Sequence, residues 1–240
     1  MMRRTQVFEL IDHAEGDLEN IEKYYGESLK NKNIPISLQI DIKNMMENLR
    51  SALDYMAHDI YEKIIEPHRK STGKKQLDKI YFPYSKDGNS FKSMLGNNLP
   101  KLETLNNNVY SIIEAIQPHK TGDMWLYHLC TLVNQNKHNS ITPQTRTETK
   151  TFEARIRGKG PAISAPAGSI EAPPGAIMIG NNPLIFDPST GIPIPTGNLD
   201  VKVTAWVSFL FSGTQLNVLP FLNKSLSEIK KLSTQLYKVI

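Results

Sequence analysis

The chain has 240 residues and a composition that is ordinary for a globular protein, with 39% hydrophobic and 22% charged residues. This length is sufficient to bury a large apolar core without disulfide or metal staples. A net charge of +4 permits a phosphate-bearing partner but does not require one. The single cysteine, Cys130, excludes an intramolecular disulfide, and no apolar run has the length of a signal peptide or a membrane span. We therefore expect a cytoplasmic protein without a membrane partner.

The first part of the chain shows helical periodicity. Residues 5–30 repeat apolar side chains roughly every three or four positions, which predicts a helix. Residues 37–65 sustain the same spacing for about seven turns, and this is the clearest helix of the sequence. We expect Pro67 to end it, residues 68–75 to form a basic linker, and residues 80–85 to be extended because Pro83 disfavours a helical Phe82.

Two more helices are predicted before residue 145. One begins at Pro100 and ends at Pro118, with its buried face on Leu102, Leu105, Val109, Ile112, Ile113 and Ile116. The other covers about residues 123–139.

The chain then changes character. Residues 158–197 hold eight of the fifteen prolines and seven of the fourteen glycines, which is typical of loops and short strands. Residues 150–158 and 200–211 alternate like strands, and residues 217–238 form an amphipathic helix that must pack on other elements.

This order of elements predicts a mainly α fold: a helical bundle with a small antiparallel β insertion before the C-terminal helix. We expect a single domain, in which residues 1–145 form the bundle. Residues 146–212 form the Pro/Gly-rich insertion, and residues 213–240 form the helix that packs back on the bundle.

The helix over 37–65 carries a polar stripe of Arg50, Asp54 and His58. At 100° per residue these side chains point within about 80° of one another, to one side of the apolar face. A carboxylate beside a histidine favours general acid–base chemistry, and the arginine is suited to phosphate. The alternative interpretation is an ordinary set of helix-surface ion pairs worth a few tenths of a kcal/mol.

The helix over 123–139 carries a second polar group, Asn134, Lys137 and His138, with Asn134 and His138 one turn apart. These residue types suit contacts to a base or a phosphate. They equally fit the end of a helix at which a histidine interacts favourably with the helix dipole. We interpret Cys130 as a buried core residue rather than a nucleophile.

Other kinds of site find no support in the sequence. The histidines have no metal-ligand spacing, and no Gly-rich phosphate loop, nucleophile elbow or dinucleotide motif occurs. We therefore expect neither a metal nor a cofactor.

Four motifs together resemble a family of bacterial HEPN-like proteins. They are the N-x-R-S-A-L-D of residues 48–54, the F-P of 82–83, the Q-P of 117–118 and the N-x-x-K-H of 134–138. The order and the spacing agree across about 35–145, and a β segment followed by an amphipathic helix is also similar to that family.

The resemblance implies a helical bundle that often forms homodimers, with polar residues of two long helices meeting at the dimer cleft. In active members, an arginine and a histidine separated by roughly four to six residues cleave RNA without metal, the histidine moving the proton and the arginine stabilising the phosphate charge. This chain departs from that pattern. No arginine precedes His138 at that distance, and seven residues separate Arg50 from His58.

Two hypotheses therefore stay open. In the first, a HEPN-like protein acts on or binds RNA or nucleotide, as a metal-independent endoribonuclease of a toxin–antitoxin or phage-defence system. Arg50, His58 and His138 would then be catalytic, Asp54, Asn134 and Lys137 would bind substrate, and an antitoxin would be a natural protein partner. In the second, the protein is a catalytically inactive HEPN-like binding or scaffold module, in which Arg50 and Asp54 form a structural pair that ties the helix over 37–65 to the helix over 123–139.

Overall fold

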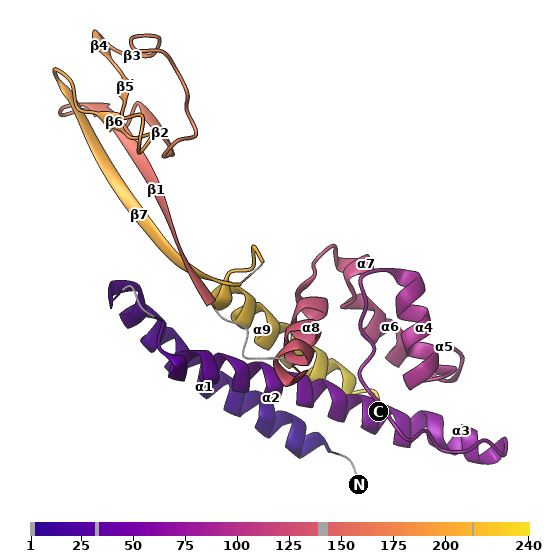
Figure 1. Cartoon of the computed structure of the whole chain (residues 1–240). Coiled ribbons are helices and arrows are strands. Elements are labelled where there is room, and N and C mark those ends of the chain that lie inside the picture. Colours follow the sequence, from indigo (N-terminus) through magenta and orange to yellow (C-terminus); the bar gives the residue numbers. More distant parts are fainter. Residues whose placement is uncertain (1–2, 32–33, 139–143, 213) are drawn as a thin grey trace. The chain divides into compact units, whose positions relative to one another are not determined.

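The computed structural model describes residues 3–31, 34–138, 144–212 and 214–240 (Figure 1). The fold is mainly helical, with a small antiparallel sheet before the C-terminal helix, as the sequence predicted. The chain divides into two compact units. The helical unit comprises Met1–Gln144 and Leu210–Ile240, and the β unit comprises Thr145–Phe209.

The helical unit is built on two long helices that lie side by side, with the C-terminal helix against both (Figure 1). Its helices are α1 (Arg4–Asn31), α2 (Ile36–Ile60), α3 (Glu66–Ser71), α4 (Gly88–Asn98), α5 (Leu102–Leu105), α6 (Asn107–Ala115), α7 (Pro118–Thr121), α8 (Trp125–His138) and α9 (Val218–Leu236). The predicted apolar series of the second helix is buried from Leu38 to Ile60, and Ile229 of α9 is fully buried as well. Each such side chain contributes roughly 1.5–3 kcal/mol of burial.

The helical path of α2 does not stop at Pro67, and the prediction that it would was wrong. A π-helical turn, Tyr61–Ile65, follows α2, and Pro67 then stands in the first turn of α3. Pro67 follows directly after the π turn, where the helical hydrogen-bond pattern already changes. The π turn also adds one residue to the helical repeat, so Ile65 is buried rather than Ile64, which lies four residues after Ile60.

The single helix predicted between Pro100 and Pro118 is divided in two. Asn106 leaves the helical conformation, and its side chain accepts a hydrogen bond from Val109 N at 3.1 Å, which caps the start of α6 and ends α5. The sequence analysis also missed α4. Its start is capped by Asp87, whose side chain accepts from Ser90 N.

The β unit has a three-stranded sheet in the order β2-β1-β7 and two short hairpins. Its strands are β1 (Gln144–Ile156), β2 (Ile163–Pro166), β3 (Met178–Ile179), β4 (Asn182–Pro183), β5 (Ile185–Phe186), β6 (Pro193–Ile194) and β7 (Leu199–Phe211). A small core of its own forms where Phe152 and Ala154 meet Ile179, Leu184 and Leu199. Alternation along β1 places Phe152 and Ala154 on one face of the sheet, and the residues between them point to the opposite, polar face.

Among the helices of the described residues, none combines the length and the apolarity that crossing a membrane requires.

A buried carboxylate joins the two ends of the helical unit to α2. Both oxygens of Asp59 accept hydrogen bonds from Arg3 N at 2.9 Å, and Tyr237 Oη donates to Oδ2 at 2.7 Å. The side chain of Asp59 is fully buried, so these donors replace the water that it loses. Burial, with Asp59 beside it, raises the pKa of Tyr237, and the phenol therefore stays protonated and donates.

We predict that Tyr237→Phe lowers the free energy of unfolding by about 1–3 kcal/mol, because the buried carboxylate loses one donor and gains nothing in its place. Urea denaturation measures this change. Tyr24→Phe is the control, since Tyr24 is 46% exposed on α1, and it should leave the stability nearly unchanged. Equal effects of the two variants would contradict the role assigned to Asp59.

Candidate functional site

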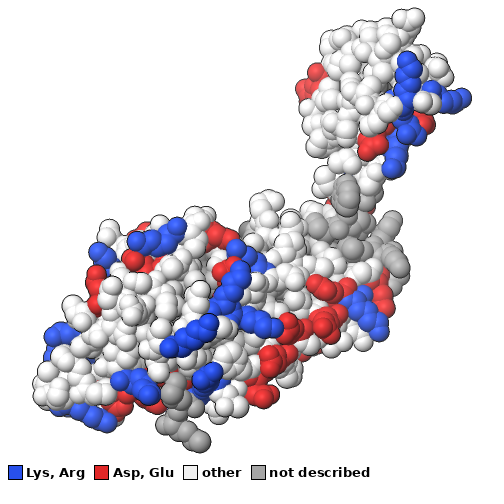
Figure 2. All heavy atoms as spheres, turned by 180° about the vertical axis from the view of Figure 1, so that it is seen from behind, with Lys and Arg blue, Asp and Glu red and all other residues white. Residues whose placement is uncertain are grey.

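Surface charge does not by itself single out a site on the helical unit. Figure 2 shows Lys and Arg side chains and Asp and Glu side chains in adjacent groups over this face, rather than one continuous basic surface. A phosphate-binding surface on this unit would therefore depend on particular residues and their contacts.

Arg50 on α2 is buried, with its side chain 6% exposed. Its Nη2 lies 2.9 Å from Asp54 Oδ1, and its Nη1 donates to Cys130 Sγ on α8. Its Cζ lies 5.1 Å from the centroid of the Tyr84 ring. The interpretation of Arg50 and Asp54 as a helix-surface ion pair is thus wrong for Arg50, because α8 and the segment around Tyr84 cover its guanidinium.

The segment over residues 80–85 belongs to no helix and pairs with no strand among the described residues. Side chains take the place of a sheet partner. Phe82 N donates to Asp54 Oδ1 at 2.8 Å, and Tyr81 N donates to Asn98 Oδ1 at 2.9 Å. Asp54 therefore binds both the guanidinium of Arg50 and the backbone of this segment.

Gln117 binds the other end of the segment over residues 80–85. It is fully buried, donates to Pro83 O at 3.0 Å and accepts from Ser85 N at 3.3 Å. The R-S-A-L-D, F-P and Q-P motifs thus meet at one place, where residues 82–85 pass between helices. Buried backbone groups need such partners, which gives each motif a structural reason.

Two tyrosines and two exposed polar residues lie on the outer side of Arg50. Asn134 Nδ2 donates to Tyr84 Oη at 3.0 Å, and the Tyr84 and Tyr127 ring centroids are 6.2 Å apart. Lys86 Nζ lies 4.8 Å from the Tyr127 ring centroid. Asn134 and Lys86 are exposed, whereas both rings are half-buried. We call Tyr84, Lys86, Tyr127 and Asn134 the tyrosine surface.

The charges beneath this surface are fixed by burial. Burial raises the pKa of the Cys130 thiol to about 11 although Arg50 opposes the rise, so the sulfur is a neutral thiol at pH 7. Burial likewise raises the pKa of Tyr84. Burial disfavours the charge of Arg50, but Cys130 and Asp54 more than offset this penalty and raise its pKa. At neutral pH, the Asp54 carboxylate is thus the anionic partner of the guanidinium.

The predicted site residues are only partly brought together. Arg50 contacts Asp54 directly, and it is joined to Asn134 through Tyr84. His58 lies one turn beyond Asp54, is half-buried and contributes none of these contacts; its charge helps to lower the pKa of Glu62, for which the hydrogen bond from Arg3 is the largest cause. The backbones of Lys137 and His138 end α8, but their side chains lie outside the described residues.

Sequence reasoning did not identify Tyr84, Lys86 and Gln117 as functional residues. Tyr84 and Gln117 stand within or beside recognised motifs, but a single tyrosine or glutamine has no periodicity that reveals its contacts. Lys86 stands two residues after Tyr84. It becomes notable only when the fold places it against Tyr127.

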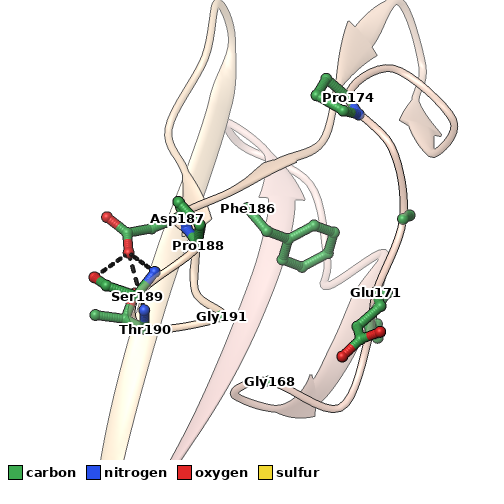
Figure 3. A pocket seen from close by; sticks show the side chains of 11 residues that line it. Gly168, Glu171, Pro174, Phe186, Asp187, Pro188, Ser189, Thr190 and Gly191 are labelled. Carbon is green, nitrogen blue, oxygen red and sulfur yellow. Dashed lines mark hydrogen bonds between the residues drawn. The ribbon is translucent and has the colours of Figure 1, made fainter.

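The β unit has a depression with a volume of about 660 Å³ (Figure 3). Phe186 points into it, and Glu171 and Asp187 are its ionisable side chains. Asp187 is engaged in its own turn, because Oδ1 accepts from Ser189 N, Ser189 Oγ and Thr190 N. The described residues that line this depression include no pair of an acid and a base. The depression therefore offers a less varied set of polar groups than the tyrosine surface does.

Within the described residues, no group of three or more His, Cys, Asp or Glu side chains is placed to hold a metal ion. The tyrosine surface offers different chemistry: an exposed cation, an amide that donates and accepts, and two aromatic rings. A cation of this kind can bind a phosphate, an amide can bind the edge of a base, and an aromatic ring can stack on the face of a base.

Comparisons with models of protein families, with curated proteins and with solved structures give no match to this chain.

We predict that Arg50→Met lowers the free energy of unfolding by about 3 kcal/mol, because it leaves the Asp54 carboxylate without its cation beneath the covering segment. Arg50→Lys should be intermediate, since it keeps the charge but loses the planar fork. Thermal and urea denaturation measure both changes.

Lys43→Met is the matched control. Lys43 pairs with Glu47 at the same i, i+4 spacing on α2, but the two side chains are 25% and 29% exposed. Its loss should cost less than about 0.5 kcal/mol. If Arg50→Met were equally mild, Arg50 would not hold these elements together.

The buried thiol generates a pH prediction. Its pKa rises on folding from an ordinary value of 9.0 to about 11, so folding favours the protonated form. The stability that this provides is present below pH 9 and is lost as the pH rises towards 11, by roughly 2–3 kcal/mol in total.

Urea denaturation between pH 8 and about pH 11 should show this loss. Tyr110, whose pKa burial raises to about 12, also weakens the fold at alkaline pH, so the difference between the wild type and Cys130→Ala isolates the thiol. Identical alkaline slopes in the two proteins would contradict the prediction.

Proposed function

We propose that the helical unit is a HEPN-like RNA-binding module that contacts single-stranded RNA or nucleotide through the tyrosine surface and does not cleave it. The observation that carries the proposal is the grouping of Lys86, Asn134 and two tyrosine rings directly above a buried arginine. The motif resemblance supports the HEPN-like assignment, and the mainly helical fold with its β segment before the last helix is consistent with it.

The chemistry of the surface favours a nucleotide ligand. Exposed Lys86 supplies a positive charge for a phosphate, and the Asn134 amide can donate to and accept from a base edge. The half-buried rings of Tyr84 and Tyr127 present aromatic faces beside them, and stacking on such faces tolerates many sequences. We propose a cytoplasmic location as well, where this kind of ligand is found.

The position of Arg50 favours binding over cleavage. A catalytic arginine must reach the phosphate on which charge develops. The side chain of Arg50 is 6% exposed, and its guanidinium already binds Asp54, Cys130 and the face of Tyr84. Arg50 therefore supports the tyrosine surface from below, and the seven-residue separation from His58 agrees with a non-catalytic role.

We predict that Lys86→Glu weakens binding of a short fluorescent single-stranded RNA by about tenfold and lowers the slope of log K against log salt by about one. Fluorescence anisotropy over a salt series measures both quantities. Tyr127→Leu should weaken binding by roughly fivefold to a hundredfold through lost stacking, with little effect on the salt slope.

Lys92→Glu is the control for charge, because Lys92 is an exposed lysine of α4 outside the tyrosine surface. It changes the net charge by the same amount and should alter the affinity less than twofold. Equal weakening by Lys86→Glu and Lys92→Glu would show binding by net charge alone and would overturn the site.

A denaturing gel of the same RNA, incubated with the protein in chelator, tests the absence of cleavage. Intact RNA is expected. Cleavage that His138→Ala abolishes without a change in melting temperature would instead establish the metal-independent endoribonuclease.

A further inference from the structure

The long strand β7 of the β unit faces no other strand of the described sheet on one edge over residues 199–204, whereas near its end Leu210 forms a bridge to Asn217 and Phe211 N donates to Leu216 O. In the three-stranded sheet, β7 lies at the end of the order β2-β1-β7, so within the described sheet only β1 pairs with it. β7 runs for thirteen residues, Leu199–Phe211, with neither proline nor glycine. Proteins commonly protect such an edge with proline, a bulge or a charge, because its free N–H and C=O groups bind another strand.

The pairing of β7 with β1 is antiparallel, and its register follows from three contacts. Arg157 N donates to Asn198 O at 3.0 Å, Arg155 Nη2 lies 2.9 Å from Asp200 Oδ2, and Thr151 Oγ1 donates to Thr204 O at 3.4 Å. The residue numbers of the paired residues increase along β7 while they decrease along β1, as in an antiparallel pair. By the same register, Glu153 stands opposite Lys202.

The register also decides which backbone groups face outwards. Since Asn198 directs its carbonyl at β1, every second residue after it, Asp200 and Lys202 included, does the same. Val201 and Val203 therefore direct their N–H and C=O groups to the outer edge. Leu199 N agrees with this alternation, because it bonds to Thr196 O and not to β1.

Side chains follow the same alternation. Leu199 and Val201 pack against the apolar core of the β unit, whereas Asp200 and Lys202 lie on the opposite, polar face. Val203, on the apolar face, remains 43% exposed. Figure 2 shows basic and acidic side chains close together on one side of the β unit, most of which is otherwise uncharged.

We propose that β7 pairs antiparallel with β7 of a second copy of this chain, across a twofold axis at Val201. In this register, Asp200 of each chain stands opposite Lys202 of the other, as a non-hydrogen-bonded pair in which side chains are closest. Exposed Val203 meets Leu199 of the second copy on the apolar face. The two Val201 residues exchange both of their outward N–H···O bonds.

This register joins residues 199–203 of the two β7 strands, and charge complementarity extends from them to β1 of each copy. On the polar face, Arg155 and Asp200 of one copy line up with Lys202 and Glu153 of the second copy. Positive and negative side chains therefore alternate from each strand to the next. The twofold axis creates a second, identical row. The neighbouring register, centred on Lys202, places Lys202 opposite itself and points inward-facing backbone groups at the partner, so both charge and hydrogen bonding disfavour it.

Disulfide cross-linking tests the register, because Cys130 is buried and is the chain's one cysteine. Val201→Cys should oxidise to a covalent dimer, since the two copies of residue 201 face each other. Val203→Cys should not, because its two copies lie about 13 Å apart along the strands. Residue 203 is the more exposed position, so stronger cross-linking there would indicate random collision and overturn the proposal.

Charge reversal tests the pairing in the folded, full-length protein. Lys202→Asp places two acids against two acids, and Asp200→Lys places two lysines against two lysines, so each variant alone should dimerise at least about tenfold more weakly than the wild type. Mixed together, the two variants restore opposite charges at both positions and should form a heterodimer. Sedimentation velocity and native mass spectrometry over a range of concentrations measure these states.

Each result decides the proposal. A wild type that is monomeric throughout would mean that Lys202 protects the edge, and a dimer that is unchanged by either reversal would place the interface elsewhere, such as on the helices. Circular dichroism of each variant confirms that the fold is kept. RNA binding by the tyrosine surface is measured separately, so failure here leaves the proposed function untouched.

Discussion

The helical unit depends on the burial of one positive charge. A guanidinium inside a protein must be paired and hydrogen-bonded, or the fold loses several kcal/mol. Arg50 meets this requirement with a carboxylate of its own helix, a thiol of α8 and the face of Tyr84. Each partner belongs to a different part of the chain, so satisfying one side chain fixes α2, the segment at 80–85 and α8 together.

The segment over residues 80–85 is subject to the same constraint, here on its backbone polar groups. Residues 80–85 lie among helices that offer no strand edge, and buried N–H and C=O groups need partners. Asn98, Asp54 and Gln117 supply them from three separate elements. Asp54 has a double duty, since it neutralises Arg50 and accepts from Phe82 N. These motifs are thus explained by stability, whereas the exposed Lys86 and Asn134 near them have no such structural requirement and are suited to contact a ligand.

The β unit rests on different physics. Its core is small, its sheet keeps one face polar, and β7 faces no other strand of the described sheet on one edge over residues 199–204. A free edge costs little in water but is available to another strand. The alternation of Arg155, Asp200, Lys202 and Glu153 makes this edge complementary to itself, so recognition of a second copy would require no new surface. Binding of RNA and association of copies would then be properties of separate units.

The sequence by itself determined the long helices, the non-helical stretch around Pro83, the strand over 200–211 and the loop-rich stretch before that strand, because periodicity and proline act locally. It placed Arg50 and Asp54 on one stripe but could not tell whether that stripe meets water or protein. The π turn after Ile60, the break at Asn106 and α4 were missed, since each depends on caps or on a shift of one residue that no periodicity records. Only the tertiary structure buried Arg50, engaged Gln117 with residues 83–85 and set Lys86 beside Tyr127. Such contacts join residues more than thirty positions apart, and their energies depend on burial, which the order of residues along a chain does not specify.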